Sequence, residues 1–106
     1  MLNDENKELC WKVLAKYGIS HQRNMVIEEC AELQKAICKL FRDDEKKDGK
    51  HQMNFLEELV DVIVMCEQMV LAEHVNNKLL NTMARIKLER ALKDENIHSD
   101  SRQADV

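Results

Sequence analysis

Residues 52–73 read QMNFLEELVDVIVMCEQMVLAE, and this stretch decides the fold. Its apolar residues cover most of the circumference of a helix, and the stretch contains no proline or glycine. A helix that is apolar nearly all round is surrounded by other helices rather than laid on the surface of a domain. We therefore predict a helix from about Gln52 to Glu73 at the centre of an all-α fold.

Two helices are predicted before this central one. The first runs from about Asp4–Tyr17, directs Leu9 and Val13 inward, and stops at the glycine that follows. The second runs over about His21–Arg42, with Ser20 as its N-cap. Its apolar residues recur every three or four positions, which is typical of one buried helix face.

The rest of the chain is predicted as a loop, a fourth helix and a tail. The charged run Asp43–Lys50 separates the second and third helices and is predicted as a solvated loop. Asn76 or Asn77 offers a cap for the fourth helix, which continues to about Glu95. Residues 96–106 are polar, and we expect them to form a frayed tail.

Residues 1–95 are therefore expected to form one domain, a four-helix bundle. Three helices from a chain of 106 residues can hardly cover an apolar fourth helix on every side. We expect a second copy of the chain to complete the bundle by two-fold pairing, giving a dimer or a tetramer.

Composition excludes several classes of protein. The formal charge of −4 argues against binding to a nucleic-acid polymer. The first 20 residues lack the basic start and apolar run of a signal peptide, and the longest apolar run is too short for a membrane span. No C-x-x-C spacing occurs, and Cys30 and Cys66 are interpreted as small buried apolar side chains. These features predict a cytoplasmic protein with reduced thiols.

Two carboxylate motifs stand out from the other acidic residues. The first is E-E-x-x-E, made by Glu28, Glu29 and Glu32, and the second is E-x-x-D, made by Glu58 and Asp61. Residues three apart share one face of a helix, so each motif places two carboxylates side by side. Antiparallel pairing of the two helices would bring the motifs together.

These carboxylates are predicted to bind a divalent cation. Asp61 interrupts an apolar run, where an unpaired buried charge costs several kcal/mol, and no Lys or Arg lies within a turn of Glu58 or Asp61. Oxygen ligands favour a hard ion, so Mg²⁺ is expected and Mn²⁺ is the alternative. A di-iron centre needs two E-x-x-H motifs. The sequence has a single match, Glu95 to His98, in the predicted tail.

With both motifs on antiparallel helices, the chain resembles the MazG-like nucleoside triphosphate pyrophosphohydrolases, an all-α family. The resemblance covers most of the length. It runs from Tyr17-Gly18 through His21-Gln22 to Met25, includes both carboxylate motifs, and reaches Lys87-Leu88-Glu89-Arg90 in the fourth helix.

The resemblance implies hydrolysis of an NTP or dNTP to the monophosphate and pyrophosphate, in clearance of surplus or noncanonical nucleotides. By motif, Glu29, Glu32, Glu58 and Asp61 would ligate Mg²⁺. Glu28 would orient or deprotonate the attacking water, or a ligand carboxylate such as Glu32 would act as the base instead.

The candidate substrate-binding residues are basic residues of the fourth helix and one of the few aromatic residues. Lys87 and Arg90 share a face, match the basic motif of the family, and are expected to bind phosphate oxygens. Gln22 matches by position alone, as a further substrate-binding residue. Trp11 is the candidate for stacking on the base.

Three other readings of the sequence stay open. A substrate like that of the related phosphoribosyl-ATP pyrophosphohydrolases fits the same fold and chemistry. A helical interaction module would use its acids for solubility or pairing. A metal-storing or redox bundle would hold iron. The sequence leaves the base and the sugar of a nucleotide substrate undecided.

Overall fold

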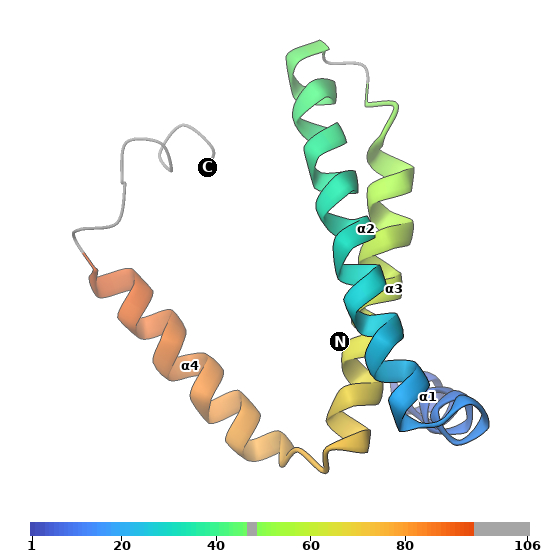
Figure 1. The fold of residues 1–106 in the computed structure, drawn as a ribbon. Helices are drawn as coiled ribbons and strands as arrows, with labels where there is room; N and C mark the ends of the chain where they lie inside the picture. The colour runs from blue at the N-terminus through green and yellow to red at the C-terminus, as the bar shows by residue number, and fades with distance from the viewer. Residues whose placement is uncertain (47–48, 95–106) are drawn as a thin grey trace. The chain divides into compact units, whose positions relative to one another are not determined.

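The structure, a computed structural model, describes residues 1–46 and 49–94, and for residues 45 and 46 the backbone alone. The described residues form four α-helices and no strand, which confirms the all-α prediction (Figure 1). The helices are α1 (Asp4–Tyr17), α2 (Ile19–Lys46), α3 (Gln52–Ala72) and α4 (Asn77–Lys93). The predicted tail, residues 96–106, lies outside the described residues.

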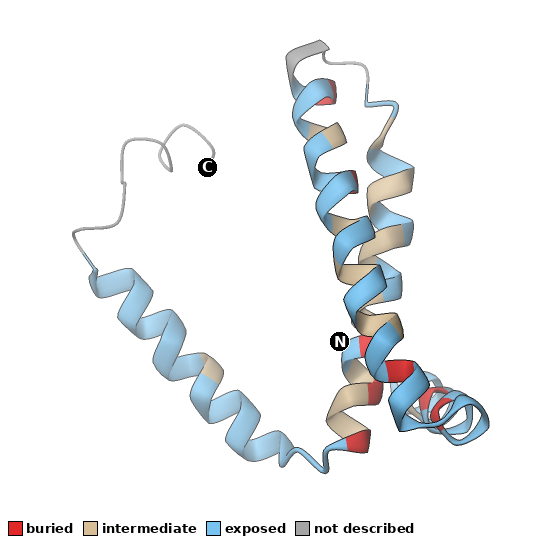
Figure 2. Cartoon of the chain, in the orientation of Figure 1, coloured by how far each residue is buried: buried red, intermediate tan, exposed pale blue. Residues whose placement is uncertain are grey.

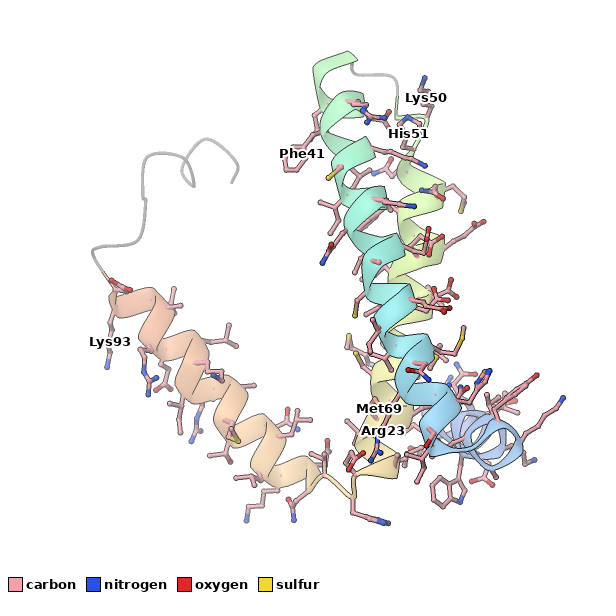
Figure 3. The ribbon with its side chains drawn as sticks, in the orientation of Figure 1. Arg23, Phe41, Lys50, His51, Met69 and Lys93 are labelled. Atoms are coloured by element: carbon pink, nitrogen blue, oxygen red, sulfur yellow. The ribbon has the colours of Figure 1, made fainter. Side chains whose placement is uncertain are left out.

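The chain divides into two compact units at the bond between His74 and Val75, and each unit is described by itself. In the first unit, α2 and α3 lie side by side and α1 packs against both (Figure 1). The pairing of α2 and α3 is antiparallel. Arg23 near the start of α2 forms an ion pair with Glu73 just after α3 (Figure 3).

The junction of α1 and α2 is a single residue, Gly18. Its φ of 88° is a conformation that favours glycine, and its N–H donates to the carbonyl of Leu14 at 2.9 Å, which ends α1. Its own carbonyl accepts the N–H of Gln22 at 3.1 Å, so α2 begins at once with Ile19. The prediction of Ser20 as N-cap was therefore wrong, because Ser20 lies inside the helix.

The far end of α2 also differs from the prediction. The helix continues through Asp43 to Lys46, where a loop was predicted. The Asp43 side chain is buried, and its Oδ2 accepts the backbone N–H of His51. His51 precedes α3 and has no capping hydrogen bond from its own side chain. Asp43 thus supplies an acceptor at the start of α3, a tertiary contact that a count of charges could not predict.

Few residues of the first unit are buried (Figure 2). On α1 they are Cys10 and Leu14. The predicted inward residues, Leu9 and Val13, are exposed, so the packed face of α1 lies one position further along the chain. The Cys10 thiol lies 3.9 Å from the carbonyl oxygen of Val64, which places α1 across the second half of α3.

The central helix α3 keeps part of its apolar surface exposed. Met65 and Ala72 are buried, whereas Met53, Leu56 and Val60 are 64%, 49% and 46% exposed. Cys66 is exposed and not buried as predicted, Cys30 is half-buried, and both thiols are free. No helix of the described part of the chain is long and apolar enough to cross a membrane.

The second unit contributes α4. The Asn76 side chain accepts the N–H of Leu79 at 3.0 Å, which confirms the predicted cap. The helix ends at Lys93, two residues before the predicted end, and has no buried residue. Its large exposed apolar residues are Leu79, Leu80, Met83, Ile86, Leu88 and Leu92.

Candidate metal centre

Three predicted ligands meet between α2 and α3. Glu29 comes from the middle of α2, and Glu58 and Asp61 come from successive turns of α3. One carboxylate oxygen from each residue lies within 4.8 Å of the other two. Glu29 and Glu58 are half-buried and Asp61 is exposed. The antiparallel pairing therefore joins the two sequence motifs into one group, which we call the carboxylate cluster.

The carboxylate cluster has no paired positive charge among the described side chains of the first unit. Within that unit, no ion pair joins a described Lys, Arg or His side chain to Glu29, Glu58 or Asp61. The pKa of Glu29 is raised above its ordinary value, first by partial burial and then by the negative charges of Asp61, Glu58 and Glu32. Asp61 itself is exposed, so the predicted free-energy cost of burying its charge does not arise. The unfavourable interaction at this site is repulsion between the carboxylates.

The donor set of the carboxylate cluster suits a hard divalent cation. Carboxylate oxygens are the ligands that Mg²⁺ and Mn²⁺ prefer, whereas zinc favours nitrogen and sulfur. Two oxygens bound to one Mg²⁺ lie at most about 4.2 Å apart. Oxygens already within 4.8 Å of one another need only small side-chain rotations to bind one ion.

Glu32 and Glu28 lie beside the carboxylate cluster without belonging to it. The exposed Glu32 pairs with Lys35 at 3.8 Å, one turn along α2. An exposed pair of this kind contributes roughly 0–1 kcal/mol, so Glu32 can exchange Lys35 for a cation. Its charge already acts on Glu29. Glu28 is exposed on α2 and precedes Glu29 in the sequence.

Gln22 is buried and fully engaged within the protein. Its Nε2 donates to Oε1 of Gln68 at 2.7 Å, and its Oε1 lies 2.6 Å from Nδ1 of His21. Only 4% of Gln22 and 1% of Gln68 is exposed. This placement favours a structural role between α2 and α3, and the substrate-binding role stays a prediction.

No role for Gln68 was predicted from the sequence, where it interrupts an apolar run on the third helix. A signal for it exists. Gln68 follows Asp61 by seven residues, and Gln22 precedes Glu29 by seven residues. Seven residues are about two helical turns, so each glutamine lies on the same helix face as the acidic residue of its pair.

Trp11 lies at the other end of the first unit from the α2–α3 connection. With 49% exposed, it lines a pocket of about 430 Å³ together with Leu71 and His74. Leu71 follows Asp61 by ten residues, which is roughly 15 Å along α3. Within one chain, the structure therefore does not bring Trp11 into the carboxylate cluster.

Lys87 and Arg90 lie on α4, in the second unit, and both are exposed. Arg90 is in the last turn of the helix, three residues beyond Lys87, so the two share a face as predicted. Arg85, two residues before Lys87, pairs with Glu89 at 3.9 Å. Binding of phosphate by Lys87 and Arg90 stays a prediction.

Comparison of the chain with protein-family models, with curated proteins and with solved structures finds no match. The resemblance to the MazG-like family therefore depends on the sequence motifs themselves. The structure adds the spatial meeting of Glu29, Glu58 and Asp61 to those motifs.

Proposed function

We propose that this protein is a Mg²⁺-dependent pyrophosphohydrolase of a nucleoside triphosphate, ribo or deoxy. The observation that carries the proposal is the meeting of three carboxylates from two helices with no cation partner among the described side chains of the first unit. Like charges held this close repel one another, and a divalent cation between them turns the repulsion into binding. Mn²⁺ fits the same oxygens.

The candidate site residues have distinct tasks in the proposed reaction. Glu29, Glu58 and Asp61 hold the ion, with Glu32 as an additional ligand. Bound Mg²⁺ supplies neutralisation of the triphosphate oxygens and a more acidic water. Glu28 orients or deprotonates the attacking water, and Glu32 is the alternative base. Lys87 and Arg90 bind phosphate oxygens, whose charge the acidic cluster would otherwise repel.

Self-association is part of the proposal. Met53, Leu56 and Val60 recur at a three- and four-residue spacing on α3 and stay exposed in one chain. Such a stripe is typical of a helix face that packs on another helix. A second copy is the proposed occupant, because a dimer or tetramer would complete the bundle that one chain leaves open.

A substrate panel tests the proposal. Purified protein is given each common NTP and dNTP with Mg²⁺ or with EDTA, and pyrophosphate is measured. We expect release from at least one nucleotide with Mg²⁺ and none with EDTA. Phosphoribosyl-ATP belongs in the panel, because the related activity would show there. Absence of release from every compound would favour the runner-up, a helical interaction module.

A further inference from the structure

A hydrogen-bonded pair of glutamines is buried where α2 and α3 pack together. Gln68 is the largest fully buried side chain of the described residues, and its Oε1 accepts Nε2 of Gln22 at 2.7 Å. The sulfur of Met65 lies 3.9 Å from Nε2 of Gln22 and 3.8 Å from Nε2 of Gln68. A thioether is a weak acceptor, so the bond between the two amides is the strong interaction of this group.

The same alignment of α2 against α3 brings together the two glutamines and, two turns away, Glu29 and Asp61. Moving seven residues along α2 leads from Gln22 to Glu29, and moving seven back along α3 leads from Gln68 to Asp61. Seven residues are two turns, about 10.5 Å along either helix. Any register of the two helices that pairs Gln22 with Gln68 therefore also sets Glu29 opposite Asp61.

The two polar groups favour different registers. Sliding α3 along α2 by one turn, about 5.4 Å, would separate Glu29 from Asp61 and relieve their repulsion. Apolar neighbours tolerate such a slide, because any apolar side chain of similar size serves in their place. The amides do not tolerate it, since each buried amide left without a partner costs about 1–3 kcal/mol.

We infer that Gln22 and Gln68 are positioning residues, which hold α2 and α3 in the one register that assembles the carboxylate cluster before a cation arrives. Single buried polar pairs fix the register of coiled helices in the same way. The inference rests on the proposed cation site and assigns Gln22 a task away from the substrate.

The first test is a double-mutant cycle with Q22M, Q68M and Q22M/Q68M, since Met has nearly the shape of Gln. Each single variant removes the amide partner of the remaining glutamine and should unfold at lower urea than wild type. The double variant should recover stability. Its affinity for Mn²⁺ alone, measured by electron paramagnetic resonance, should nevertheless fall about tenfold, the range typical of groups that orient metal ligands.

A control variant distinguishes the effect of a changed helix register on Mn²⁺ affinity from the effect of lower stability. Leu14→Val removes a buried methylene from α1 without touching the pairing of α2 with α3. It should lower the urea midpoint and leave the Mn²⁺ affinity unchanged. If Q22M/Q68M does not fold, Q22N/Q68N replaces it, because the shorter amides cannot span the same gap.

Two native thiols report the register directly. Cys30 lies on α2 and Cys66 on α3, and the pKa of the Cys66 thiol is raised first by partial desolvation and then by the Cys30 thiol. A short thiol-reactive cross-linker should join them in wild type, as peptide mapping by mass spectrometry would show. The yield should fall in Q22M/Q68M and stay unchanged in Leu14→Val.

The outcomes are distinguishable. A folded Q22M/Q68M with wild-type cross-linking and wild-type Mn²⁺ affinity would overturn the inference. Wild-type protein that binds no Mn²⁺ would overturn the cation site instead. In that case the cross-linking yield alone decides whether the glutamines hold the register.

Discussion

Glu29 on α2 and Asp61 on α3 hold carboxylate oxygens within 4.8 Å of each other, although 32 residues separate them in the chain. Glu58 completes the carboxylate cluster from the preceding turn of α3. The folded protein therefore concentrates negative charge where two helices meet. Its stability and activity should both depend on what neutralises that charge.

The first prediction concerns pH. Folding raises the pKa of Glu29 above its ordinary value of 4.5, through burial and the charges of Asp61, Glu58 and Glu32. The folded state then binds more protons than the unfolded state, so stability falls as pH rises from about 4.5 through the raised pKa. Metal-free E29Q should be more stable than wild type at pH 7 and should lack this fall. Thermal melts between pH 4 and 8 would measure both.

Glu57 supplies the matched control, because it is exposed on α3 beside Glu58 and lies outside the carboxylate cluster. E57Q should keep the wild-type pH profile. Mg²⁺ should raise the melting temperature of wild type and E57Q, since a ligand that binds the folded state stabilises it, and should do less for E29Q. Equal pH profiles for E29Q and wild type would contradict the charge crowding at Glu29.

The second prediction concerns assembly. Met53, Leu56 and Val60 are exposed in one chain, and covering them in a second copy buries apolar surface. Light scattering behind size exclusion should give a dimer or tetramer at micromolar concentration. Leu56→Glu should shift the mass toward the monomer, whereas E57Q should not. A wild-type monomer would refute self-association.

The third prediction concerns Asp43, whose Oδ2 accepts the backbone N–H of His51. Asp43→Ala leaves that N–H without an acceptor and should lower the free energy of unfolding by about 1–3 kcal/mol. Asp43→Asn keeps an acceptor oxygen and should lose less. Urea titration measures the difference. Equal stability of wild type and Asp43→Ala would show that the contact contributes nothing.

The fourth prediction concerns the basic face of α4. Lys87→Ala should raise KM or lower kcat, because an ammonium that binds phosphate oxygens stabilises substrate or transition state. Lys78, in the first turn of the same helix, is the matched position, and Lys78→Ala should change neither constant. If kcat/KM of Lys87→Ala equals that of wild type, Lys87 is not part of the site.

The sequence predicts helix ends correctly where a nearby capping residue or glycine determines them. The bounds of α1 and the Asn76 cap followed from capping residues and glycine alone. The ends of α2 did not, because Gly18 caps it through a backbone carbonyl and Asp43 extends it through a contact with a residue eight positions away. Contacts of that kind depend on how the helices pack, which residue propensities do not encode.

The candidate site was also predictable only in part from the sequence. Equal spacing in both motifs located Glu29, Glu58 and Asp61, which the antiparallel pairing then joined. The partner of Gln22 was not predicted, because a single glutamine in an apolar run gives no sign of what it bonds. Trp11 is a candidate for base stacking on its aromatic character alone, and that character does not determine which end of the α2–α3 pair the side chain occupies.

The most direct test compares pyrophosphate release by D61N and E57Q with that of wild type, in Mg²⁺, on the best nucleotide of the panel. D61N removes a proposed ligand charge and leaves a side chain of similar size, and E57Q removes a neighbouring charge outside the carboxylate cluster. We predict that E57Q keeps wild-type activity and that D61N loses about 100-fold or more in kcat/KM, which is about 2.7 kcal/mol or more of transition-state stabilisation. Full activity in a folded D61N would contradict the central claim.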